Sequence, residues 1–91
     1  MADAFVYDHV RTPRGKGKAD GSLHEVTAVC LAETALRAIA TRNKLEKGSV
    51  EDVILGCVDP VGEASGDIAR SAAIAADYGF QVPGIQINRF C

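Results

Sequence analysis

The apolar and polar positions of the chain predict three strands. Residues 5–10 (FVYDHV) alternate loosely and are rich in β-prone side chains, so they predict a first strand, which ends before Pro13. Residues 53–58 (VILGCV) form a continuous apolar run, which is typical of a parallel strand covered on both faces. Residues 85–90 (IQINRF) begin with alternation and predict a third strand.

The segment between the first and second predicted strands has the pattern of a helix. Ser22 and Glu25 have the spacing of a capping box, and the helix is expected to continue to about Thr41, with Asn43 closing it. Apolar residues recur at three- and four-residue steps and mark its buried stripe: Val29, Ala32, Leu36 and Ile39.

The segment between the second and third predicted strands predicts a helix from Ile68 to about Tyr78. Asp67 is placed to cap its start, and Gly79 is the expected stop. Because this helix carries little polar surface, we expect it to be buried between layers. The order strand-helix-strand-helix-strand predicts an α/β fold with two right-handed crossover units on a mostly parallel sheet.

The amino-acid composition limits the classes of protein to which the chain can belong. With 91 residues, 47% hydrophobic and 24% charged, the chain predicts one small globular domain. The net charge of −2 gives no reason to expect nucleic acid as a partner. The apolar runs are too short to span a membrane, and the start resembles no signal or transit peptide, so a cytoplasmic protein is expected. Three cysteines without a C-x-x-C pair predict reduced thiols and neither a disulfide framework nor a metal site.

The loop at residues 15–21 (GKGKADG) stands where a dinucleotide-binding fingerprint would stand. Asp20 occupies the place of the third glycine, where a carboxylate would face the pyrophosphate, and no Walker A ending follows. A solvated basic loop is therefore the expected reading. A looser role, with Lys16 or Lys18 near an anionic substrate, stays open.

Other polar residues are candidates by type alone. His9 and His24 have no partner at a suggestive spacing, so structural or surface roles are expected for both. Three carboxylates could gather near the carboxyl ends of the strands, although spacing does not establish that they converge: Asp8, Asp59 and Glu63.

The three cysteines differ in context. Cys30, on the packed side of the first helix, and Cys57, inside an apolar strand, are expected to be small buried hydrophobes. Cys91 lies at the carboxyl end of the last strand, where alternation places the amides of Gln86 and Asn88 on one face. It is the candidate catalytic residue, because a helix beginning after it would lower the pKa of its thiol. A packing role for the same sulfur is the alternative.

Four segments in order resemble the thiolases, the acyl-CoA C-acyltransferases. They are VRTP at 10–13, VILG at 53–56, ARSAA at 69–73 and INRFC at 87–91, of which the last is the most specific. The resemblance runs from Phe5 to Cys91. It implies that residues 1–91 are the N-terminal, incomplete part of the first of two similar α/β domains.

The resemblance implies that Cys91 accepts the acyl group during thiolytic cleavage of 3-ketoacyl-CoA, or in the reverse Claisen condensation. It implies coenzyme A and acyl-CoA as substrates with no further cofactor, and a homodimer or homotetramer with the strand at 85–90 in the dimer contact. The family's histidine and second cysteine match no residue here, so the 91 residues alone are expected to be inactive.

Two alternatives remain. One is a related ketoacyl-synthase-type condensing enzyme with a carrier-bound substrate. The other is a non-catalytic thiolase-like binding subunit in which Cys91 only packs. Phe90 stands where many thiolases carry a polar residue, which would alter the pocket beside the sulfur.

Overall fold

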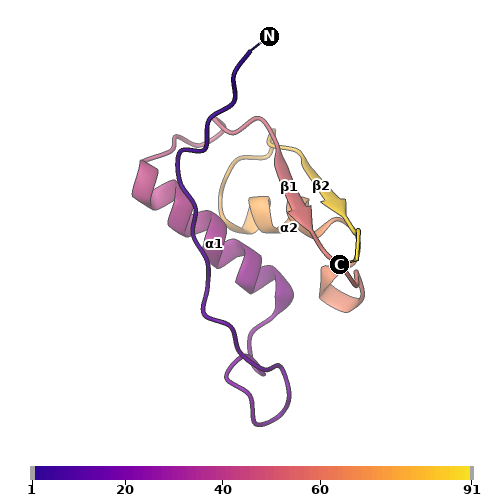
Figure 1. The fold of residues 1–91 in the computed structure, drawn as a ribbon. Coiled ribbons are helices and arrows are strands. Elements are labelled where there is room, and N and C mark those ends of the chain that lie inside the picture. Colours follow the sequence, from indigo (N-terminus) through magenta and orange to yellow (C-terminus); the bar gives the residue numbers. More distant parts are fainter. Residues whose placement is uncertain (1, 91) are drawn as a thin grey trace.

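The computed structural model describes residues 2–90, so Cys91 lies outside the described residues. Along the chain these residues form helix α1 (Ala28–Asn43), strand β1 (Val53–Gly56), the short 3-10 helix η1 (Gly62–Ala64), helix α2 (Ile68–Ala75) and strand β2 (Gly84–Ile87) (Figure 1). The predicted α/β class is confirmed, with helices and parallel strands alternating along the chain.

β1 and β2 pair in parallel over four residues. The register places Val53 opposite Gly84 and Gly56 opposite Ile87, and the N–H of Cys57 donates the last ladder bond to the Ile87 carbonyl at 2.9 Å. Both strands are shorter than predicted. The ladder ends at Cys57, and the chain bends at Val58 and Asp59.

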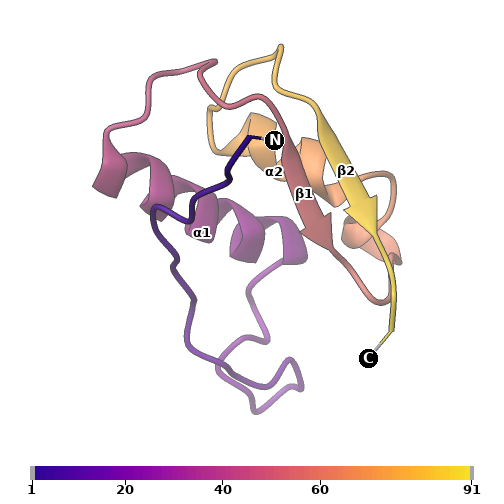
Figure 2. The same ribbon diagram turned by 45° about the horizontal axis from the view of Figure 1, so that its top comes forward.

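The core lies between α2 and one face of this sheet. α2 contacts α1 as well as both strands, so it is the central element of the packing (Figure 2). Four of its residues are buried, and they are mostly alanines, which allow the backbones to approach closely: Ile68, Ala69, Ala72 and Ala73. The predicted burial of this helix is met in part, since Ser71 and Ile74 are exposed. Val82, which precedes β2, is the largest fully buried side chain in the described part of the chain.

The other face of the sheet is open. Ile54 is 65% exposed, and its register partner Ile85 is 48% exposed. The expectation that helices cover β1 on both faces is therefore met on one face only. Within residues 2–90, neither α1 nor α2 is long and apolar enough to cross a membrane.

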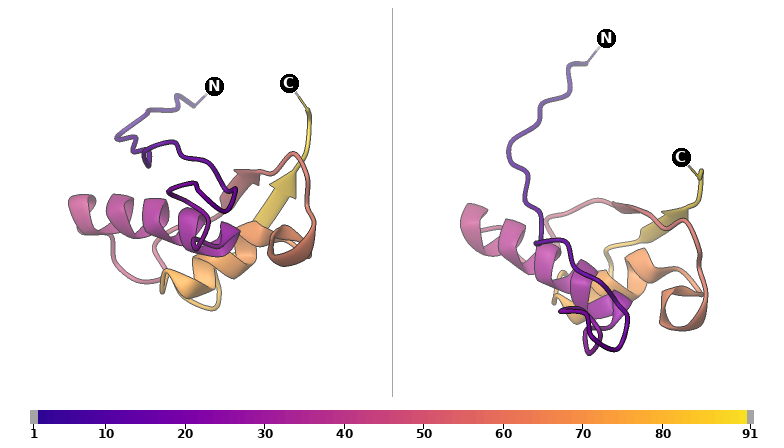
Figure 3. Two further views of the ribbon diagram at one scale, coloured as in Figure 1. Left: turned by 90° about the horizontal axis from the view of Figure 1, so that it is seen from below. Right: turned by 60° about the horizontal axis from the view of Figure 1, so that its bottom comes forward.

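The predicted first strand is not formed. Residues 5–10 run as an extended segment over α1 and join no sheet in the described chain (Figures 1 and 3). A strand requires a ladder partner for its backbone groups. Here side chains hold the segment instead, since the Asp8 carboxylate accepts from the Asn43 amide at 2.9 Å and lies 3.3 Å from the Arg42 guanidinium. Tyr7 remains 92% exposed.

α1 begins five residues later than predicted. Thr27 is the N-cap, and its hydroxyl accepts from the N–H of Cys30 at 3.1 Å. The residues of the predicted capping box belong to turns of the preceding loop, where the N–H of Leu23 donates to the Lys16 carbonyl at 3.0 Å. The prediction that Asn43 closes the helix is confirmed.

α2 ends at Ala75, three residues before the predicted end. Asp77 adopts the left-handed conformation, with φ of 61°, that glycine usually supplies at a helix terminus. The N–H of Tyr78 then bonds back to the Ala73 carbonyl at 3.0 Å, and the N–H of Asp77 bonds to that of Ile74 at 3.0 Å. This Schellman-type closure leaves Gly79 outside the helix.

Candidate active site at the carboxyl edge of the sheet

The carboxyl ends of β1 and β2 lie at the same edge of the sheet, because the strands are parallel (Figure 2). An open hollow of ≈ 610 Å³ lies there, lined by the strand ends and the residues that follow: Ile54, Gly56, Cys57, Val58, Ile87, Arg89 and Phe90. Parallel α/β sheets open their sites at this edge. Cys91, the predicted nucleophile, follows Phe90 directly in the sequence, but it lies outside the described residues, so its role stays a prediction.

β2 presents two different faces on its way to this edge. Gln86 points toward α2, where its amide oxygen accepts from the N–H of Ile68 at 3.2 Å. Ile85 and Ile87 lie on the open face, where they are about half exposed. The predicted alternation is therefore confirmed within the strand, while Asn88 lies beyond its end.

The first turn of α2 is fixed by polar contacts. Asp67 is its N-cap, as predicted, and its carboxylate accepts from the N–H of Arg70 at 3.3 Å. The Arg70 guanidinium donates to the carbonyl oxygen of Val82 at 2.8 Å. Neither this contact nor that of Gln86 was predicted from the sequence. The period-two spacing of Val82, Gly84 and Gln86 was the signal that could have placed all three against α2.

The three candidate carboxylates do not converge. Asp8 lies against the last turn of α1, and the hydrogen bond from Asn43 is the main reason that the pKa of Asp8 is lowered. Glu63 lies at the opposite end of α1, where it accepts from the N–H of Val29 at 3.1 Å. These two ends are roughly 20 Å apart along the helix, given its rise per residue. Asp59 is exposed on the turn after β1, so no carboxylate pair forms.

The two histidines take the surface positions expected of them. His24 places Nδ1 3.1 Å from the Gly17 carbonyl oxygen and Nε2 3.7 Å from the Glu25 carboxylate. The backbone N–H of His9 donates to the Asp8 carboxylate at 2.8 Å. Both histidines are exposed, and neither lines the hollow at the carboxyl edge.

The basic loop is solvated, as predicted. Lys16 and Lys18 are both exposed. A shallow hollow of ≈ 570 Å³ lies against the loop, lined by Arg14, Gly15, Lys16, Asp20, Gly21 and Ser22. Since Asp20 shares that hollow with the cations, its charge opposes an anionic ligand there.

The expectation for Cys30 was wrong. Cys30 is exposed in the first turn of α1. Cys57 is only partly buried: it follows β1, donates the last ladder bond and lines the hollow at the carboxyl edge, so its expected burial is not met. Among residues 2–90 there is no group of three or more metal-ligating side chains.

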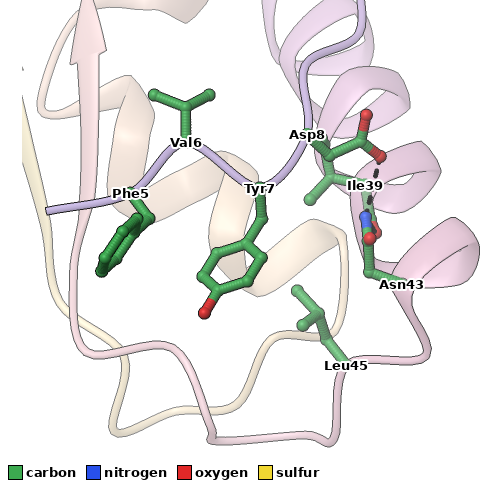
Figure 4. A pocket seen from close by; sticks show the side chains of 7 residues that line it. All are labelled: Phe5, Val6, Tyr7, Asp8, Ile39, Asn43 and Leu45. Atoms are coloured by element: carbon green, nitrogen blue, oxygen red, sulfur yellow. Dashed lines mark hydrogen bonds between the residues drawn. The ribbon is translucent and has the colours of Figure 1, made fainter.

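A second hollow, of ≈ 660 Å³, lies between the N-terminal segment and α1 (Figure 4). Its lining is mainly apolar, with the Asp8–Asn43 hydrogen bond at one side: Phe5, Val6, Tyr7, Asp8, Ile39, Asn43 and Leu45. This hollow was not predicted from the sequence, because the pattern of residues 5–10 predicts a strand in the sheet. It holds no nucleophile or acid–base pair, so the carboxyl edge of the sheet remains the candidate site.

The chain is similar in sequence to several known thiolases. The chain is 41% identical over 91 residues to a steroid 3-ketoacyl-CoA thiolase of Mycobacterium tuberculosis. It is 40% identical over 92 residues to the 3-oxoadipyl-CoA/3-oxo-5,6-dehydrosuberyl-CoA thiolase of Escherichia coli, and 35% identical over 92 residues to a 3-ketoacyl-CoA thiolase of Cronobacter sakazakii.

Each of these alignments covers 100% of this chain but only 22% to 24% of the relative. The chain thus spans about a quarter or less of the length of the curated relatives that it matches. Residues 4–91 match the N-terminal domain of thiolases. The resemblance carried by the four sequence segments is confirmed, and the chain belongs to the thiolase family.

Proposed function

We propose that the chain is the N-terminal part of a longer thiolase that uses Cys91 to carry the acyl group between two coenzyme A thioesters. The family match through residue 91 carries this proposal. The strand geometry supports it, because the two residues before Cys91 line the open hollow where the parallel strands end. Several relatives are named as 3-ketoacyl-CoA thiolases, which favours this substrate class.

The proposed chemistry is covalent catalysis. The Cys91 thiolate attacks the keto carbonyl of 3-ketoacyl-CoA, the carbon–carbon bond breaks, and the departing carbon takes a proton to give acetyl-CoA. The thiol of coenzyme A then attacks the acyl-cysteine, releases the shortened acyl-CoA and returns the thiol. The enzyme thioester conserves the energy of the substrate and divides one difficult displacement into two easier ones. Condensation is the same sequence in reverse.

The remaining groups are proposed to come from the rest of the longer protein. The histidine and second cysteine implied by the resemblance match no residue of this chain. Further chain is also proposed to cover the open sheet face, where Ile54 is 65% exposed. The 91 residues alone are therefore proposed to be inactive. The complete enzyme is proposed to be a cytoplasmic homodimer or homotetramer that uses coenzyme A as substrate and no other cofactor.

The test replaces Cys91 by serine in the complete enzyme and measures thiolysis of a 3-ketoacyl-CoA. Cys91→Ser should lose at least about 100-fold in kcat, since a hydroxyl is a far weaker nucleophile than a thiolate at neutral pH. Cys30→Ser is the matched control, because Cys30 is an exposed thiol on α1 that does not line the hollow at the carboxyl edge. Near-normal activity of Cys91→Ser would contradict the proposal.

Alkylation separates the alternatives. In the thiolase, iodoacetamide should modify Cys91 rapidly, and acyl-CoA should protect it. A condensing enzyme of the ketoacyl-synthase type should be protected by an acyl carrier instead. In a binding subunit, the thiol should react slowly and no acyl donor should protect it.

A further inference from the structure

We propose that Gln86 and Arg70 are positioning residues that fix how far β2 extends toward the candidate active site, and thereby place Cys91. This inference rests on the proposed function, because the position of Cys91 matters for catalysis only if its sulfur accepts the acyl group. Neither residue lines the hollow at the carboxyl edge, so each acts through the strand.

β2 and the residues before it meet α2 at every second position. The carbonyl oxygen of Val82 accepts from the Arg70 guanidinium, and the amide oxygen of Gln86 accepts from the N–H of Ile68. Between them, Gly84 lies directly on the helix backbone. A Cβ at Gly84 would lie 2.6 Å from the backbone nitrogen of Arg70. The strand is thus tied to the first turn of α2 at three successive positions on one face.

The pairing of β2 with β1 does not by itself fix the register of β2. A slip of β2 by one residue along β1 would turn its isoleucines from the open face toward α2, so the side-chain pattern opposes it. A slip by two residues keeps every side chain on its original face, and it also preserves the parallel hydrogen-bonding pattern. Alternation therefore does not fix the register against a two-residue slip.

The contacts of β2 with α2 fix its register against this two-residue slip. A two-residue slip in either direction would place a bulky side chain, that of Val82 or Gln86, where Gly84 now meets the helix backbone. It would also remove the Gln86 oxygen from the N–H of Ile68. At about 3.3 Å per residue, the same slip would displace the strand end by about 6.6 Å. The Ile68 N–H is one of the unpaired amides of a helix start, so the Gln86 oxygen also satisfies a group without an intrahelical partner.

The experiment uses the complete enzyme and compares Gln86→Met, Gln86→Glu and Gln81→Met. Methionine keeps the length of glutamine but removes the acceptor, whereas glutamate keeps an oxygen that can accept from the Ile68 N–H. Gln81 is the matched control, since it is exposed and lies five residues earlier in the same segment. Arg70→Lys forms a second, independent test of the contact with the Val82 carbonyl.

The measurements are kcat and KM for thiolysis, the pH profile of Cys91 alkylation, and the melting temperature. We expect Gln86→Met and Arg70→Lys to lower kcat by roughly 10- to 100-fold with little change in KM, because a misplacement of even about an ångström is enough to cost about 100-fold in rate. The alkylation profile should shift in the same variants. Gln86→Glu should recover most of the kcat, and Gln81→Met should match the parent enzyme.

The proposal is overturned if Gln86→Met lowers only the melting temperature, with kcat and the alkylation profile unchanged, because that is a purely structural effect. Should Gln86→Met fail to fold, Arg70→Lys decides by the same two readouts. Failure of the proposed function is recognised separately, because Cys91→Ser would then retain activity in the otherwise unaltered enzyme.

Discussion

The hydroxyl of Tyr78 donates a hydrogen bond of 2.6 Å to the carbonyl oxygen of Leu36, which fastens the chain just after α2 to the middle of α1. Tyr78 is only 7% exposed and belongs to the core cluster. This contact joins residues that are 42 positions apart in the sequence. It holds α1 against the helix that supports β2.

Tyr78→Phe should therefore lower the free energy of unfolding by about 0.5–1.5 kcal/mol, which is the usual net value of one hydrogen bond. Denaturant unfolding of the complete enzyme measures it. Tyr7→Phe is the matched control, because Tyr7 is 92% exposed, and it should change stability by less than about 0.5 kcal/mol. Equal effects of the two variants would contradict this role.

Alkaline pH should weaken the same contact. Burial raises the pKa of Tyr78 above its ordinary value of 10.0, since the fold disfavours the phenolate. Because the folded pKa is the higher one, this contribution to stability is complete below about pH 10 and is lost as pH rises through the folded pKa. Unfolding midpoints measured between neutral and alkaline pH should fall more steeply for the parent than for Tyr78→Phe. Parallel curves would count against the assignment.

Gly84 should not tolerate a side chain. Gly84→Ala would place a Cβ 2.6 Å from the backbone nitrogen of Arg70 and 2.8 Å from the backbone carbonyl carbon of Ala69, and neither is part of a flexible side chain that could move aside. Overpacking of this kind costs about 1–3 kcal/mol. Gly17→Ala serves as the control, because a Cβ there meets nothing within 4 Å. The denaturant midpoints of the two variants are compared with that of the parent. If Gly84→Ala leaves the midpoint unchanged, β2 does not lie so close to α2.

Sequence patterns predicted α2 and β2 better than the N-terminal segment. The helix cap at Asp67, the burial of the alanine-rich helix and the alternation around Gln86 are local features, so they can be recognised from neighbouring residues. The strand at residues 5–10 was predicted from the same kind of alternation. A strand, however, requires a ladder partner, and local sequence does not specify one.

The helix ends show a similar limit. Ser22 and Thr27 are both acceptable caps by residue type, and the backbone bonds of the preceding loop favour the second. Gly79 was the obvious stop for α2, yet Asp77 adopted the left-handed conformation first. The contact of Arg70 with a carbonyl 12 residues away depends on tertiary packing, because the period-two spacing indicates which residues face α2 but does not specify Arg70 as the partner.

The N-terminal segment should be released when Asp8 loses its partners. Asp8→Ala removes the acceptor for the Asn43 amide and the neighbour of Arg42, so trypsin should cleave after Arg11 faster than in the parent. Limited proteolysis of the dilute 91-residue chain measures the rate. Asp3→Ala is the control at the exposed start of the same segment. Identical cleavage rates for Asp8→Ala and the parent would contradict the role of these contacts.

The acyl-enzyme is the central claim, and trapping it is the most direct test. The complete enzyme is mixed with a 3-ketoacyl-CoA in the absence of coenzyme A, quenched in acid, digested and analysed by mass spectrometry. The account predicts a shortened acyl group as a thioester on the peptide that contains Cys91, and its disappearance when coenzyme A is added before the quench. An active enzyme whose Cys91 peptide stays unmodified, or which carries the acyl group on another residue, would contradict the account.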